Sequence, residues 1–147
     1  MPIPFLQRIQ ALAGSAVNKI VPAGPGPAAA AAEQLLKQLL SGLPELLAAA
    51  VVEVESGQLL ASYTTSREFN LSKAIGFNAE VIRQQRRAMQ ALQLPAEEQL
   101  DDILITLQNQ LHLLRLLSDG RRFLYVAVDC RDTNLGIARA VMRTCQE

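Results

Sequence analysis

The sequence predicts a small mixed α/β domain in which helices cover both faces of one sheet. Residues 99–147 contain two apolar strands, a turn with the sequence SDGRR, a third strand and a closing helix. These strands are apolar on both sides, so helices must lie above and below them to exclude water. The 147 residues provide one domain with a real core and are too few for two ordinary domains.

The first part of the predicted domain is a helix followed by a hairpin. Residues 28–41 predict a helix, because its leucines recur at helical spacing and Gly42 follows them. Residues 46–53 and 58–63 predict two antiparallel strands. Gly57 lies in the turn between them and supplies the positive φ that such a turn requires.

Residues 71–94 predict the longest helix, which ends before Pro95. Its apolar stripe consists of Leu71, Ala74, Ile75, Val81, Ile82, Ala88, Met89 and Leu92. Asn78 and Gln85 lie within this stripe, where an amide without a partner is costly. Two arrangements satisfy them: bonds to sheet backbone or water, or pairing across a symmetric helix interface that fixes its register.

Three strands and a helix complete the predicted domain. The strands span residues 100–107, 110–117 and 123–129, with a tight turn at 108–109 and a second hairpin turn at Asp119–Gly120. Asp132, Thr133 and Asn134 are candidate caps for the closing helix.

An amphipathic segment and a linker precede the domain, in residues 1–27. Phe5, Ile9 and Leu12 recur at helical spacing in residues 1–20, and three prolines and two glycines follow in residues 21–27. The domain boundary is therefore predicted near Ala28. The amphipathic helix either packs on its own domain or docks on a partner or a membrane surface.

Composition narrows the function classes. Half of the residues are hydrophobic, which is more apolar surface than a monomer of this size needs and therefore indicates an oligomer. Fourteen basic and fourteen acidic side chains cancel, so no net field attracts nucleic acid or an anionic membrane. Two isolated cysteines and no apolar run of about 20 residues predict a cytoplasmic protein with reduced thiols.

Candidate chemical groups are few. His112 is the single histidine, which excludes a metal site built on two histidines, and Cys130 next to Arg131 is a candidate activated thiol. Asp101 and Asp102 are adjacent in a predicted strand, so their side chains point to opposite faces and do not suit a cooperating acid pair. We expect these charges instead to keep an exposed sheet edge from pairing with the wrong strand. We therefore expect no catalytic, cofactor or metal site. The alternative is a ligand-sensing or enzymatic domain that uses His112 and Cys130.

Two groups of arginines are candidate anion sites or ordinary solvated surface. Arg83, Arg86 and Arg87 lie in the long predicted helix, and Arg121 and Arg122 lie at the second hairpin turn. No aromatic side chain lies among them to stack on a base or a ring, so solvated surface is the better interpretation.

Two motifs in this chain are similar to those of the Roadblock/LC7 family. LPELLAAAVVEVESGQLLAS resembles the end of the family's first helix and its glycine-turned hairpin, and DTNLGIARAVMR resembles the opening of its last helix. The element order also matches, over residues 33–147. The N-terminal segment and the arginine- and glutamine-rich end of the long helix depart from the family pattern.

The resemblance implies a profilin-like three-layer sandwich, with a five-stranded antiparallel sheet and helices on both faces. It further implies a non-enzymatic homodimer, joined through the strand at 100–107 and the helix at 71–94. Family members serve as dynein light chains, as scaffolds or, in bacteria, as regulators of Ras-like GTPases. The implied interface residues are Ile75, Asn78, Val81, Ile82, Gln85, Met89, Ile103 and Ile105, and Phe5, Ile9 and Leu12 are candidates for docking a partner.

Overall fold

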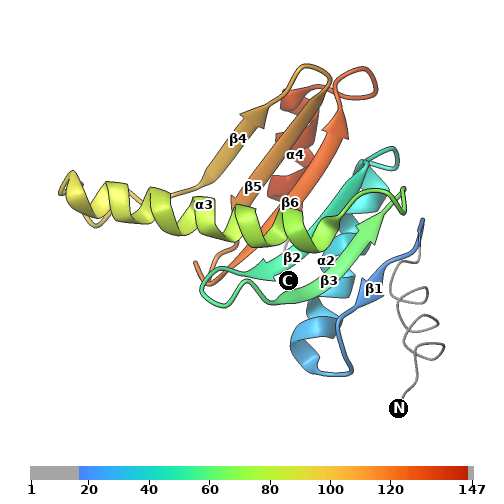
Figure 1. The fold of residues 1–147 in the computed structure, drawn as a ribbon, viewed down its shortest axis with the longest axis horizontal. Helices are drawn as coiled ribbons and strands as arrows, with labels where there is room; N and C mark the ends of the chain where they lie inside the picture. The colour runs from blue at the N-terminus through green and yellow to red at the C-terminus, as the bar shows by residue number, and fades with distance from the viewer. Residues whose placement is uncertain (1–16, 146–147) are drawn as a thin grey trace, which may run out of the picture.

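A computed structural model describes residues 17–145 and shows one antiparallel sheet between two helical layers (Figure 1). The strand order is β1-β3-β2-β6-β5-β4. The strands are β1 (Val21–Pro22), β2 (Ala48–Glu53), β3 (Leu59–Thr64), β4 (Asp102–Thr106), β5 (Gln110–Leu116) and β6 (Arg122–Asp129). The helices are α2 (Pro27–Gly42), α3 (Leu71–Ala91) and α4 (Leu135–Thr144). The predicted N-terminal helix lies almost entirely outside the described residues.

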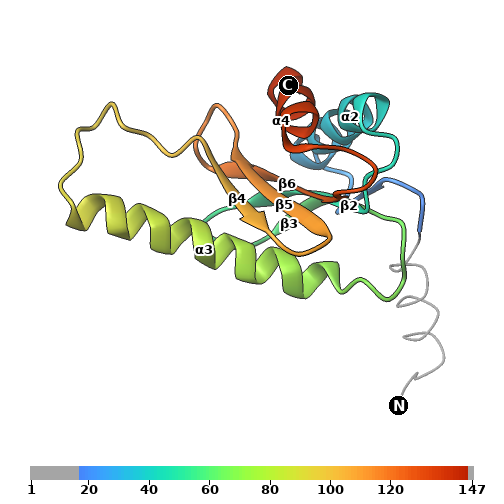
Figure 2. The same cartoon turned by 90° about the horizontal axis from the view of Figure 1, so that it is seen from above.

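The two helical layers are unequal. Seen from above, α2 and α4 lie on one side of the sheet and α3 lies alone on the other (Figure 2). The part of α3 nearest its C-terminus extends past β4 (Figure 2). Strand and helix side chains form two cores, one on each face of the sheet, because β2, β5 and β6 are apolar on both sides. This arrangement confirms the predicted fold class.

The predicted hairpins are present. Gly57 and Gly120 have φ values of 70° and 68°, the left-handed conformation that glycine adopts without a steric cost. In the second hairpin, the Asp119 carboxylate accepts the backbone N–H of Arg121 at 2.9 Å. The turn chemistry read from the sequence therefore fixes both hairpin connections.

The sheet has six strands and not the predicted five. Val21 and Pro22, which the sequence analysis assigned to a linker, form β1 and pair with Ser62 and Ala61 of β3. Pro22 has no N–H and is tolerated at the edge of a sheet, where one side of the strand needs no partner. A two-residue strand containing proline has no periodicity, so pattern alone assigns it to a linker.

The long helix ends three residues before its predicted end. Gln93 has a φ of 54°, and the N–H groups of Gln93 and Leu94 bond to the carbonyls of Gln90 and Met89. This is the Schellman arrangement, in which a left-handed residue terminates the helix. Pro95 therefore follows the helix end by several residues and does not itself set it.

Candidate interaction surface

One side of α3 carries apolar side chains that no described residue covers. Phe77 is 73% exposed, Leu92 is 70% exposed and Val81 is 38% exposed. Gln85 and Ala88 lie between them and are also exposed. The five residues are spaced by three or four positions and form one line along the helix, which we call the α3 strip.

The edge strand β4 is the second unusual feature. It pairs with β5 on one side, and no strand of residues 17–145 pairs with its outer side. Ile103, Leu104 and Ile105 are half-buried there. Natural edge strands commonly carry charged residues, proline or a bulge that prevents further pairing. β4 has no lysine or proline, and Asp102, which the sequence analysis expected to protect this edge, is bonded to Arg139 of its own chain. Its edge is therefore open to another strand.

The charged residues at the start of β4 belong to intrachain ion pairs. Asp102 accepts two hydrogen bonds from the guanidinium of Arg139 in α4, at 2.7 and 2.9 Å, and the Asp102 side chain is 9% exposed. The bonds from Arg139 hold the pKa of Asp102 below its usual value. Asp101 pairs with Arg115 and Arg143. Both carboxylates thus fasten β4 to its own domain.

The residues implied as a dimer interface divide into two groups. Ile75, Asn78 and Ile82 are 5%, 8% and 0% exposed and face the chain's own sheet, where the two isoleucines pack in the core with Phe123 and Tyr125. Their own domain buries these three side chains, which leaves little of them for a second copy to contact.

The accessible members of that implied set are Val81, Gln85, Met89, Ile103 and Ile105. The sequence analysis missed the large exposure of Phe77 and of Leu92. The available signal was the spacing of Phe77 four residues before Val81, which places both on one line of the helix. The apolar residues of α3 therefore lie on two neighbouring faces, one buried on the sheet and one exposed, where the sequence predicts a single stripe.

His112 is held by two hydrogen bonds. Its Nε2 lies 2.8 Å from Oε1 of Gln110, and its Nδ1 lies 2.9 Å from the hydroxyl of Tyr125. A neutral imidazole fits both: Nε2–H donates to the amide oxygen, and Nδ1 accepts from the hydroxyl. Burial lowers the pKa of His112 and raises the pKa of Tyr125. Both ring nitrogens are therefore committed to structural bonds.

The thiol candidates do not join His112. Cys130 is exposed just after β6, and its neighbour Arg131 is engaged by the Asp129 carboxylate at 2.5 Å. No hydrogen bond or ring contact within residues 17–145 connects His112 with Cys130. The same residues contain no group of three His, Cys, Asp or Glu side chains able to hold a metal ion. The arrangement that the enzymatic alternative requires is not found there.

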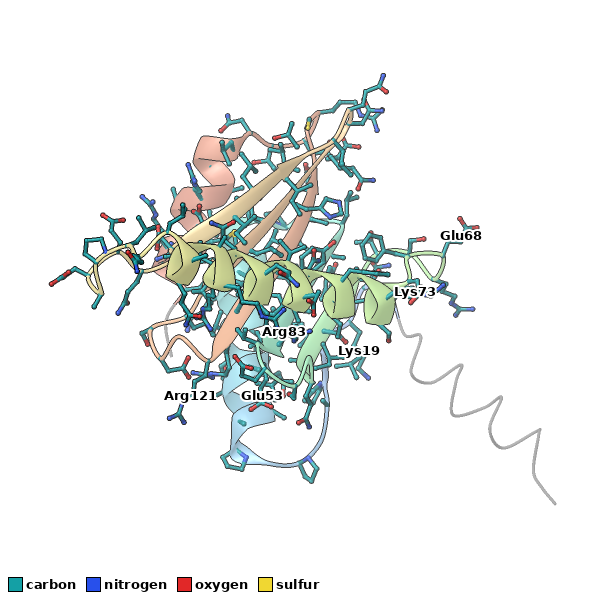
Figure 3. All side chains as sticks on the ribbon, turned by 60° about the vertical axis from the view of Figure 1, so that its left-hand side comes forward. Lys19, Glu53, Glu68, Lys73, Arg83 and Arg121 are labelled. Carbon is teal, nitrogen blue, oxygen red and sulfur yellow. The ribbon has the colours of Figure 1, made fainter. Side chains whose placement is uncertain are left out.

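Two of the arginines hold the hairpins. Arg83 donates to the carbonyl of Val54 at 2.6 Å, and in Figure 3 it lies beside the hairpin that carries Glu53. Arg86 donates to the carbonyl of Gly120, also at 2.6 Å. Neither anion binding nor simple solvation, the two interpretations taken from the sequence, describes these residues. They tie α3 to the two turns at one end of the sheet.

A cleft of about 890 Å³ lies at this end of the sheet, between α3, the segment after it, the β5–β6 turn and the end of α4. Its charged residues are three bases and three acids: Arg86, Arg115, Arg143, Glu98, Asp101 and Asp119. Because these charges balance and most are paired with one another or with backbone, the cleft has no net field for an anion.

No protein-family model matches the chain, and no curated protein matches it. Solved structures do match. MglB from Myxococcus xanthus is 14% identical with a TM-score of 0.70, and the match covers 84% of this chain and 87% of that one.

A Roadblock/LC7 domain from Streptomyces avermitilis is 12% identical with a TM-score of 0.62, over 76% of this chain and 88% of that domain. This chain has the fold of a Roadblock/LC7 domain. A gliding protein MglB from Thermus thermophilus is 16% identical with a TM-score of 0.57, over 84% of this chain and 95% of that one. At these identities the likeness concerns the Roadblock/LC7 fold alone and transfers no residue role.

Proposed function

We propose that this protein is a non-catalytic adaptor that forms a homodimer and binds a small Ras-like GTPase or another regulatory protein. The single observation that carries the proposal is the combination of the α3 strip and the open β4 edge in a domain of Roadblock/LC7 fold. Both features are apolar, and both belong to the elements through which the family resemblance implies a dimer.

The two features lie on the same side of the sheet. Ile103 of β4 packs against the core that contains Ile75 and Ile82 of α3, so α3 and the inner face of β4 share one core. A two-fold axis at this edge would pair β4 with β4 of a second copy and bring the two α3 strips together. We expect such an interface to bury Phe77, Val81 and Ile105 and to leave the intrachain bonds described above in place.

The partner is proposed from the fold and from the charge balance. The formal net charge is zero, so recognition by shape and apolar contact is favoured over electrostatic attraction. None of the helices described between residues 17 and 145 is long and apolar enough to cross a membrane. The proposed complex, which we expect to be cytoplasmic, contains a homodimer of this chain and a regulatory partner.

Sedimentation equilibrium of the intact chain tests the dimer. Wild-type protein is expected to be dimeric at micromolar concentration, and Val81→Asp to be monomeric, because a carboxylate in the seam would be buried without a counter-charge. Gln34→Asp, which places the same charge on the exposed face of α2 across the sheet, is the matched control and should remain dimeric. A monomeric wild type, or a dimeric Val81→Asp, contradicts the proposed interface.

A separate measurement tests the partner. A purified Ras-like GTPase would be immobilised with GDP or with a non-hydrolysable GTP analogue, and binding of the intact chain would be recorded by surface plasmon resonance. Binding that depends on the nucleotide is expected. Equal, negligible binding to both forms would refute the GTPase as partner while leaving the dimer measurement unaffected.

A further inference from the structure

The half of the α3 strip nearest the start of the helix contains its most exposed large side chain. Phe77 is 73% exposed, and Val81 lies one helical turn further on. Exposed aromatic rings in a continuous apolar line are typical of surfaces that another segment covers. A segment that covers Phe77 and Val81 must therefore be able to reach the first half of α3.

The described chain begins beside this part of α3. The backbone N–H of Asn18 donates to the carbonyl of Thr64 at 2.7 Å. Thr64 in turn lines one cavity together with Asn70, Leu71 and Ser72, which form the start of α3. Figure 3 places Lys19 and Lys73 at this same end of the molecule. Phe77 lies about 9 Å further along the helix, at a rise of 1.5 Å per residue.

The sixteen residues that precede Val17 have the spacing needed to cover the strip. Phe5, Ile9, Leu12 and Ala16 fall on one face of a helix, and Gln7 falls on the opposite face. Phe5 and Ala16 are eleven positions apart, as are Phe77 and Ala88. As a helix, each interval measures about 17 Å.

We propose that residues 5–16 pack as a helix along the α3 strip of their own chain. Because the described chain begins at Val17, beside the start of α3, the segment must run antiparallel to α3, with Phe5 towards Ala88. This orientation also places the two helix dipoles in opposition, which is favourable. A second consequence rests on the proposed dimer. The N-terminal segment and the second copy compete for Phe77 and Val81, so the segment weakens dimerisation.

A disulfide cross-link in the full chain tests the packing. The variant combines Ile9→Cys with Gln85→Cys, the position of the α3 strip that lies beside Ile9 when Phe5 is at Ala88. It is made in a Cys130→Ser background, because Cys130 is exposed and would compete, whereas Cys145 is buried. Oxidation is expected to give a cross-link within one chain, visible as altered mobility on a non-reducing gel and as loss of two free thiols. The matched control replaces Ile9→Cys by Gln7→Cys and should form the bond at least tenfold more slowly.

The outcomes separate the occupants of the strip. Equal rates for the Ile9 and Gln7 pairs would show random encounters and overturn the packing, and a cross-link between two chains would assign the strip to the N-terminal segment of the second copy. The comparison of the two rates within one chain does not depend on whether the protein dimerises, so its failure is distinct from failure of the proposed dimer.

Sedimentation equilibrium then tests the competition. Ile9→Asp is expected to lower the dimer dissociation constant at least tenfold, and Gln7→Asp to leave it within twofold of wild type. A higher dissociation constant for Ile9→Asp would place the segment inside the dimer interface and overturn the competition. If every variant, including wild type, is monomeric at all concentrations, the proposed dimer and the competition both fall, and the cross-link alone decides the packing.

Discussion

Ile82 and Val81 are adjacent in α3, and the structure gives them opposite roles. Ile82 is fully buried beneath the helix, and Val81 is 38% exposed on the α3 strip. Truncation of each side chain to alanine therefore separates the stability of the domain from its association. Ile82→Ala should destabilise folding, and Val81→Ala should not.

The magnitude for Ile82→Ala follows from its burial. The substitution removes three carbon atoms from the core, worth about 2.4 kcal/mol at ~0.8 kcal/mol for each buried methylene. The cavity that remains adds to this, and a total of roughly 3 kcal/mol lies within the usual range for Ile→Ala. For a domain of this size the melting temperature should fall by roughly 10 °C. Val81→Ala should change the free energy of unfolding by less than about 0.5 kcal/mol.

Urea denaturation followed by circular dichroism provides the measurement. It should be made at a protein concentration below the dimer dissociation constant, so that association does not contribute to the unfolding free energy. The reasoning fails if Ile82→Ala costs less than about 1 kcal/mol, because a fully buried side chain cannot be removed so cheaply. It also fails if the two variants are equally destabilised.

Three further predictions concern the polar contacts. Arg86→Met keeps the aliphatic stem but removes the donor to Gly120, and should lower the free energy of unfolding in a urea titration by about 1 kcal/mol. The control Arg87→Met, on the exposed side of α3, should lower it by less than about 0.5 kcal/mol. Equal losses would refute the role of the bond to Gly120. Burial lowers the pKa of His112, so below about pH 6.5 the unfolded chain binds more protons than the folded chain does. The free energy of unfolding should therefore fall as the pH drops from 6.5 towards 5. If this pH dependence persists in His112→Asn, another group causes it. Asp102→Asn should lower the urea midpoint at pH 7. Because Arg139 holds the pKa of Asp102 below its usual value, the difference in midpoint between the variant and the wild type should shrink as the pH falls below about 4. A difference in midpoint that does not change with pH would exclude the ion pair as the cause.

The sequence identified most of the elements, for reasons that are local. Gly57 and Gly120 fix the two hairpins because a positive φ strongly favours glycine, and the Asn134 side chain caps α4 by accepting the N–H of Ile137 at 2.9 Å. Strands that are apolar on both sides require helices on both faces. Each of these inferences depends on residues that are neighbours in the chain, so sequence alone supports it.

The sequence did not determine the placement of β1 or the division of α3 into two faces. Val21 and Pro22 become a strand only because the edge of β3 is available to them. Ile75, Val81 and Ile82 all fit one helical repeat of apolar residues, and only the position of the sheet decides which of these side chains are buried. The partners of Arg83 and Arg86 lie 29 and 34 residues away in the chain.

The fold class, the turns and the lack of a recognisable chemical motif can all be read from the amino-acid sequence, because they depend on local patterns. The sequence does not show which apolar residues stay exposed, because burial depends on where the sheet lies relative to the helix. The three-dimensional arrangement therefore places the candidate interaction surface on Phe77, Val81 and Leu92 and assigns Ile75 and Ile82 to the core of the chain itself.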